Sequence, residues 1–169
     1  MTARMTGRAR GGPAGSSGVR IRRATARDAK RLTALVRNSG AYEGPYAPMV
    51  AGYRVGPDYI EAHEVHLAAG EDGRVLGFYA LVLAPPELDL LFVADAAQGL
   101  GVGRGLIAHM TERARAAGVS AVRVVSHPPA EGFYRSVGAR RTGTVAARPP
   151  AVMWDRPDMV IAVAPPAGK

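Results

Sequence analysis

The chain has 169 residues, 47% of them apolar, which is enough for one domain with a substantial core. It has no cysteine, which excludes disulfides and thiolate metal sites, and its four histidines lack the spacing of metal ligands. No apolar run approaches the roughly 20 residues of a membrane helix, so a membrane-spanning helix is not expected. The net charge of +8 comes mostly from six arginines in residues 1–23, and the nearly balanced remainder, with 16 basic and 14 acidic residues, argues against a nucleic-acid-binding body.

Residues 1–18 form a basic, glycine-rich segment that lacks the apolar stretch of a signal peptide. Excess charge and low hydrophobicity are typical of flexible segments, so we expect a flexible basic N-terminal tail here. Its arginines would give weak, nonspecific contact with nucleic acid at most, so no specific nucleic-acid partner is expected. A single domain is expected over residues 19–165, in a protein of the cytoplasm.

The first part of the chain shows helix and strand patterns in turn. Alternating apolar residues predict a strand over residues 19–25, and helical periodicity predicts a helix from Thr25 to Gly40. Residues 41–56 are rich in Tyr, Pro and Gly, which predicts a loop or a broken helix. A short helix then begins at Pro57, because proline suits the first helical turn.

Strands predominate in the rest of the chain. Residues 65–86 predict a hairpin around the turn GEDG, and the apolar run at residues 87–95 predicts a strand buried on both faces. A helix with an apolar stripe follows over residues 103–118. Further strands are expected at residues 120–127, 139–147 and 151–164, with a short helix at residues 129–138. These elements together predict an α/β sandwich on a mixed sheet.

A glycine-rich segment, AAQGLGVGRGLI at residues 96–107, joins the apolar strand to the following helix. Gly99, Gly101 and Gly103 stand at every second position. A helix N-terminus has backbone N–H groups without partners, and glycine lets a phosphate come close to them. The spacing does not fit a Rossmann fingerprint, and no lysine is present for a P-loop. The loop Gln98–Arg104 therefore predicts a diphosphate site, with a charge-assisted contact from its arginine.

Gln98, Gly101 and Gly103 form the pattern Gln-x-x-Gly-x-Gly, and the sequence resembles the GNAT superfamily of acetyl-CoA-dependent N-acetyltransferases. LFVADAAQGLGVGRGLIAHMTERARAAG is similar to the family's pyrophosphate-binding strand, loop and helix, and VRVVSHPPAEGFYRSVGA is similar to its next segment, although GAR replaces the commoner GF ending. The resemblance covers about residues 19–164. It implies the GNAT fold, an α/β (α+β) architecture whose mixed central sheet of about seven strands splays between the fourth and fifth strands, with helices on both faces.

The resemblance implies acetyl-CoA as an acyl-donor substrate, with its pantetheine between the splayed strands. The Val93 amide would then polarise the thioester carbonyl as an oxyanion donor. Ser126 stands where many relatives have asparagine, and the small Ala130 suits close approach of CoA. The residues implied to contact CoA are Leu91, Phe92, Val93, Gln98, Gly99, Leu100, Gly101, Val102, Gly103, Arg104, Ser126, Ala130 and Phe133.

Catalytic roles follow from the same resemblance. Tyr134 falls on the family's tyrosine in FYRSVG, so its phenol would protonate the leaving thiolate as a general acid; a buried aromatic with a packing role is the alternative. Period-two alternation places Glu87 and Asp89 on the face of Leu91 and Val93. A partly desolvated carboxylate there would serve as the general base, while an ordered water, or a solvated strand end without a role, stays open.

The loop rich in Tyr and Pro corresponds to the family's usual substrate lid. The residues expected to line an acceptor pocket are Tyr42, Tyr46, Tyr53 and Trp154. Ordinary core packing is the alternative for each of them. His127 precedes two prolines and is interpreted as a surface residue rather than a base.

The function that follows is an N-acetyltransferase that transfers an acetyl group from acetyl-CoA to a primary amine by direct attack. The alternative is a non-catalytic GNAT-like module that binds acyl-CoA without turnover. Small amines, amino acids, antibiotics and peptide or protein amines all stay open as acceptors. Relatives often pair through their last strands, which leaves a homodimer open. No metal and no membrane partner are expected.

Overall fold

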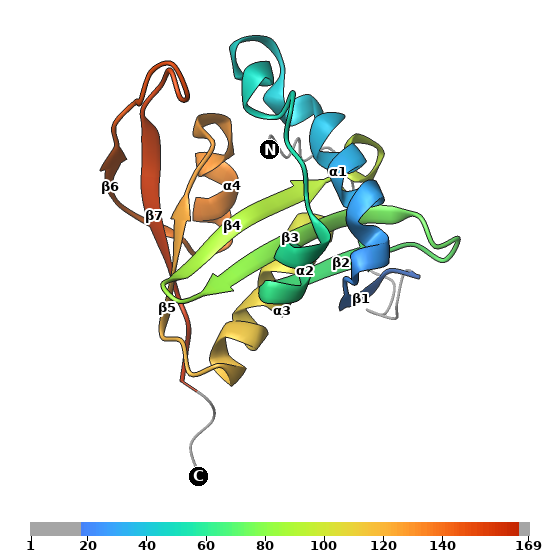
Figure 1. Cartoon of the computed structure of the whole chain (residues 1–169). Helices are drawn as coiled ribbons and strands as arrows, with labels where there is room; N and C mark the ends of the chain where they lie inside the picture. Colours follow the sequence, from blue (N-terminus) through green and yellow to red (C-terminus); the bar gives the residue numbers. More distant parts are fainter. Residues whose placement is uncertain (1–17, 166–169) are drawn as a thin grey trace.

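Residues 18–165, the part that the computed structural model describes, build a seven-stranded mixed β-sheet with helices on both faces (Figure 1). The expected basic tail, apart from Gly18, lies outside the described residues. The strand order is β1-β2-β3-β4-β5-β7-β6, and β4 and β5 are the parallel neighbours in it. The strands are β1 (Arg20–Arg23), β2 (Glu64–Ala69), β3 (Val75–Leu83), β4 (Pro86–Val93), β5 (Ala121–Val125), β6 (Arg140–Val145) and β7 (Arg156–Ala162).

The helices are amphipathic or short, and each lies against one face of the sheet. The α-helices are α1 (Ala29–Arg37), α2 (Pro57–Ala62), α3 (Val102–Ala116) and α4 (Glu131–Ser136). The 3-10 turns are η1 (Ala26–Asp28), η2 (Gly40–Tyr42), η3 (Gly44–Met49), η4 (Asp95–Ala97) and η5 (Pro128–Ala130). No helix within residues 18–165 combines the length and apolar character needed to cross a membrane.

Alternation along β3 creates two hydrophobic cores, one on each face of the sheet. Phe78 and Ala80 pack in the core that contains apolar side chains of α1 and α2. Tyr79 and Leu81 pack in the core that contains α3 and α4. Because successive side chains of a strand point to opposite faces, α1 and α2 cover one face and α3 and α4 cover the other.

The predicted fold class is confirmed, including the splay between the fourth and fifth strands. β4 and β5 pair at Glu87 and Arg123 alone within the described chain, whereas β3 and β4 pair along seven register positions. Figure 1 shows the two strands diverging from this pair toward the end of the sheet where α4 lies. The sheet therefore opens in its middle instead of at an edge.

Most predicted elements are present, and two of the differences at their ends illustrate how the boundaries shifted. The first α-helix ends at Arg37 instead of Gly40, and Gly40 begins the η2 turn. The last strand begins at Arg156 instead of Ala151, because backbone hydrogen bonds between Arg148 and Val152 close a turn ahead of it. Both differences come from local backbone pairing at chain reversals.

Gly77 allows α3 to sit close to β3. A Cβ at Gly77 would lie 2.7 Å from the Phe92 carbonyl oxygen and 3.1 Å from Leu106 Cδ1. We therefore expect Gly77→Ala to lower the free energy of unfolding by about 1–3 kcal/mol, as for other overpacked sites. Denaturant unfolding measures this. Gly105→Ala, where nothing lies within 4 Å of the new Cβ, is the matched control and should not destabilise. Equal unfolding midpoints for the two variants would contradict the close packing.

Candidate functional site

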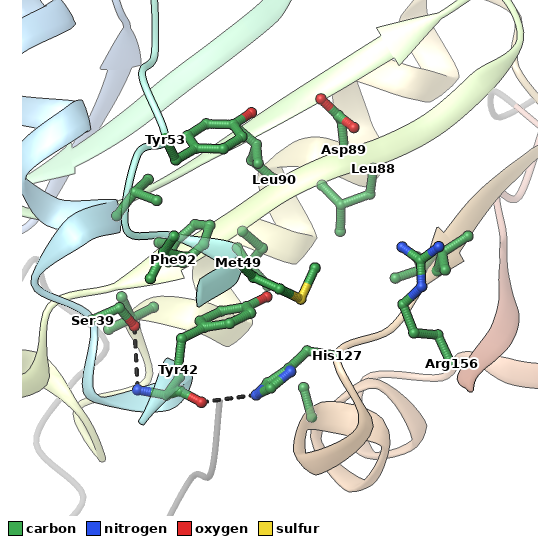
Figure 2. A pocket seen from close by; sticks show the side chains of 18 of the residues that line it. Ser39, Tyr42, Met49, Tyr53, Leu88, Asp89, Leu90, Phe92, His127 and Arg156 are labelled. Atoms are coloured by element: carbon green, nitrogen blue, oxygen red, sulfur yellow. Dashed lines mark hydrogen bonds between the residues drawn. The ribbon is translucent and has the colours of Figure 1, made fainter. Parts of the chain in front are cut away.

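A cavity of about 210 Å³ lies where β4 and β5 diverge. Leu91 and Val93 line it from β4, and Val124 and Val125 line it from β5. Figure 2 shows side chains from β4, from the segment before α2 and from β7 around this space. The cavity is thus built on unpaired strand edges.

The backbone of Val93 has one free edge toward this cavity. Ala94 N donates to Leu76 O on β3 at 2.8 Å. Because neighbouring amides in an antiparallel strand point to opposite sides, the Val93 N–H points away from β3, toward β5. The Val93 carbonyl accepts a hydrogen bond from Gln98 Nε2 at 3.1 Å, which fixes the plane of the following peptide.

A β-bulge in β4 changes the faces of its carboxylates. Leu81 pairs with Leu88 and Ala80 pairs with Leu90, so Asp89 is an extra residue in β4. The bulge reverses the alternation, and Leu88 shares the α3 core with Val93. The prediction that Glu87 and Asp89 share a face with Leu91 and Val93 is therefore wrong: Glu87 pairs with Val82 and lies on the face of α1 and α2.

Asp89 borders the cavity, whereas Glu87 does not line it. Tyr59 of α2 donates a hydrogen bond from Oη to Asp89 Oδ2. Burial and this bond raise the pKa of Tyr59, so its phenol stays a donor to the carboxylate. Asp89 is thereby held in place by a side chain of α2.

The glycine-rich loop has the backbone that its sequence predicts. Gly99 and Gly101 have φ angles of 78°, a left-handed conformation that favours glycine. Helix α3 begins at Val102, and Gly105 N donates the first helical bond to Gly101 O at 3.0 Å. The N–H groups of Val102, Gly103 and Arg104 precede that bond and have no acceptor within the helix.

The other predicted CoA contacts are distributed unevenly. Leu91, Phe92 and Ala130 line the cavity, and Phe133 packs against the α3 core beside Tyr134. The exposed Arg104 reaches α4, where its guanidinium donates to Ser136 O and Oγ at 3.4 Å.

Two further predicted contacts do not face the cavity. Ser126 is 1% exposed, and its hydroxyl donates to the His127 carbonyl at 2.7 Å. That bond leaves Ser126 no hydrogen to offer a ligand in this arrangement. Leu100, in contrast, is 71% exposed at the turn of the glycine loop.

Tyr134 enters the cavity from α4 and is 8% exposed. Burial raises the pKa of its phenol above the usual value, so the hydroxyl keeps its proton. A phenol in this position is available as a proton donor to a group in the cavity.

Of the four aromatic residues predicted to line the acceptor pocket, two line the cavity and two lie outside its lining. Tyr42 and Tyr53 line the cavity, and Tyr42 stacks on Phe92 with a centroid distance of 5.5 Å. Tyr46 and Trp154 lie outside the lining, with ring centroids 4.6 Å apart. They support the wall from behind, through the contact of Tyr46 with His127 at 4.5 Å.

His127 is buried, so its interpretation as a surface residue is wrong. Its ring stacks on Tyr42 at 4.1 Å, and Nε2 donates to the Ala41 carbonyl at 2.8 Å (Figure 2). Burial lowers the pKa of His127 to about 4, so the ring is neutral at pH 7. Its Nδ1 is then a buried acceptor without a protein partner among the described residues.

Arg156 also lines the cavity, and the sequence analysis did not name it. The apolar residues Pro157, Met159 and Ile161 alternate with it along β7 and are buried. This period-two pattern places Arg156 on the opposite face, and it is the signal that could have found it. Within residues 18–165, no cluster of three or more His, Asp or Glu side chains is arranged to hold a metal ion.

A family model of the acetyltransferase (GNAT) domain matches residues 54–148, more than half of the chain. The chain therefore belongs to the GNAT family of acetyltransferase domains, which confirms the resemblance. A search of curated protein sequences found no significant match.

Solved structures share the fold at low sequence identity. A GCN5-related N-acetyltransferase (aminotransferase, class-II) from Rhodopseudomonas palustris is 20% identical, with a TM-score of 0.75 over 86% of this chain and 96% of that one. A putative acetyltransferase from Salmonella typhimurium, solved with its cofactor acetyl-CoA, is 19% identical, with a TM-score of 0.68 over 90% and 98%. A phosphinothricin acetyltransferase from Sinorhizobium meliloti, in complex with acetyl-CoA, is 21% identical, with a TM-score of 0.67 over 90% and 92%.

Proposed function

We propose that residues 19–165 form one N-acetyltransferase domain that moves an acetyl group from acetyl-CoA to a primary amine. The observation that carries this proposal is the cavity between the diverging β4 and β5, in a chain that also presents backbone amides without helical acceptors at the start of α3. The acetyl-CoA bound in two solved structures of the same fold supports this choice of donor.

The residues present fit coenzyme A at both of its ends. A diphosphate would accept hydrogen bonds from the N–H groups of Val102, Gly103 and Arg104, where the helix dipole favours negative charge. The left-handed glycines before α3 leave these donors without Cβ atoms in front of them. Pantetheine would then follow the free edge of β4 past Leu91, in place of the hydrogen bonds that β5 does not make.

The transfer would take place at the cavity end of that edge. The amine nitrogen attacks the thioester carbonyl carbon, a C–N bond forms, and the C–S bond breaks. The Val93 N–H stabilises the negative charge that develops on the carbonyl oxygen. Tyr134 gives its proton to the leaving sulfur, and the proton of the attacking nitrogen goes to a base.

Asp89 is the better placed of the two carboxylates proposed as that base. It borders the cavity and is oriented by Tyr59, whereas Glu87 lies outside the lining. An ordered water held by Asp89 would serve the same purpose through one extra transfer.

Calorimetric titration with acetyl-CoA tests donor binding, and a free-thiol assay with a panel of primary amines tests turnover. Gly101→Ala should weaken acetyl-CoA binding by about tenfold or more, because φ near +78° strains alanine and displaces the amides of α3. Gly105→Ala, one turn further along α3, is the matched control and should bind normally. The absence of binding to the native chain would refute the function, and binding without turnover would favour an acyl-CoA-binding module.

Tyr134→Phe should lower kcat by about 10²-fold, because general acid catalysis typically contributes 10² or more. The acetyl-CoA Kd should hardly change, since the hydroxyl contributes to the leaving step instead of to binding. Steady-state kinetics and calorimetry on the same preparation separate the two effects. An unchanged kcat would leave Tyr134 a purely structural side chain.

Asp89→Asn and Glu87→Gln should differ in their rate–pH profiles. We expect Asp89→Asn to lower the rate about 10²-fold over the acidic-to-neutral part of the profile, because its amide cannot accept the proton of the attacking amine. Glu87→Gln should retain the profile of the native chain, since that side chain does not line the cavity. If both variants keep the rate–pH profile of the native chain, neither carboxylate acts as the general base.

A further inference from the structure

Arg156 brings a positive charge to the acceptor side of the cavity. It stands at the start of β7 on the face opposite the buried Pro157, and it lines the cavity with Tyr42 and Asp89. Figure 2 shows its side chain rising from β7 across the cavity from Tyr42, with Asp89 on β4 above. The two charged side chains of the lining thus come from strands on opposite sides of the gap between β4 and β5.

The charge of Arg156 lacks a carboxylate partner. Among the arginines of residues 18–165, Arg115 and Arg156 are the two that are not exposed. Arg115 pairs with Glu112 and donates to the Ala164 carbonyl at 2.8 Å. Arg156 forms no ion pair with any described residue, and its Nε is buried without a hydrogen-bond partner.

The nearest carboxylate along β7 is already occupied. Asp158 lies two residues from Arg156 and therefore on the same face of the strand. Arg123 binds it in a bidentate pair, with Nε–Oδ1 and Nη2–Oδ2 distances of 2.9 Å. The pair explains why Asp158 does not neutralise Arg156.

Apart from Asp89, which accepts a hydrogen bond from Tyr59, the remaining wall has no charged group to compensate the guanidinium. Met49, Leu88 and Val125 are apolar, and burial raises the pKa of Tyr42 to about 12 despite the opposing charge of Arg156, so the phenol stays neutral. A half-buried cation against such a wall is costly unless a hydrogen-bonded anion joins it. A ligand that supplies this anion gains a bidentate, charge-assisted contact.

We propose that Arg156 binds the carboxylate of the acceptor, which makes the acceptor an amino acid or a similarly small amino-carboxylate. This inference rests on the proposed acetyl transfer and specifies its second substrate. The amine would lie toward Asp89 and the thioester, and the carboxylate toward β7. A cavity of about 210 Å³, part of which the acetyl group would occupy, is below the size of sites for drug-sized ligands and suits such a molecule.

The test compares each free amino acid with its own amide across the standard set, using acetyl-CoA and a thiol-release assay. The two differ in the carboxylate alone, so the native chain should show kcat/KM at least about tenfold higher for the best amino acid than for its amide. Arg156→Gln should abolish that preference by raising KM for the amino acid about 10- to 10²-fold, with kcat little changed, because the contact is made equally in ground and transition states. Arg156→Lys should fall between.

Arg140→Gln is the matched control, because it removes the same charge from exposed β6, outside the cavity lining, and should keep the native preference. All variants should bind acetyl-CoA with unchanged Kd, which shows that they are folded. Equal use of amino acid and amide by the native chain, or equal losses with both in Arg156→Gln, would overturn the inference while leaving acetyl transfer intact.

A second measurement decides the case without turnover. Calorimetric titration of the best amino acid and its amide into the protein, with and without CoA, should show carboxylate-dependent binding that Arg156→Gln removes. If acetyl-CoA fails to bind, the proposed function fails by itself. If amino acid and amide bind equally, or neither binds, the assignment to Arg156 fails.

Discussion

The divergence of β4 from β5 is the constraint on which the site depends. Central strands of a sheet normally satisfy both of their edges, and a buried N–H without a partner costs free energy. Here the two strands meet at Glu87 and Arg123 and then leave each other, so the inner edge of β4 ends at the Val93 N–H. A ligand with extended amide groups would restore those hydrogen bonds. The affinity of the site for such a ligand would therefore come from the backbone groups of β4 that β5 leaves unpaired.

The proposed donor and acceptor sides of the cavity are connected by hydrogen bonds to the same η2 turn. Asp95, in the turn that leads to the glycine loop, accepts the Gly40 N–H at 3.1 Å. On the other side of the same η2 turn, His127 donates to the Ala41 carbonyl. Tyr42 is thus fixed from two directions, and the wall of the proposed acceptor pocket is anchored to the segments that would hold CoA.

Local signals made much of this structure predictable. The glycine loop, the hairpin turn and the Pro57 helix start depend on residues within a few positions of each other, and all three are present. The bulge at Asp89 depends on how β3 and β4 pair, which no short window of sequence specifies. It decided which face carries the carboxylates, and period-two counting alone gave the wrong side.

The same distinction explains why Arg156 was missed and why His127 was wrongly interpreted as a surface residue. The chain has 22 basic residues, so one more arginine carries no signal in composition, and the period-two pattern of β7 gives only the face on which it lies. What sets Arg156 apart is a half-buried guanidinium without a carboxylate partner, a property that arises only when β7 lies beside β5 and Arg123 binds Asp158. His127 is similar, because burial keeps it neutral, and the ring that stacks on it, Tyr42, is 85 positions away in the sequence. The properties of Arg156 and His127 thus depend on which partners their neighbours already bind. The proposed acceptor pocket therefore follows from the packing of the folded chain and not from a local sequence pattern.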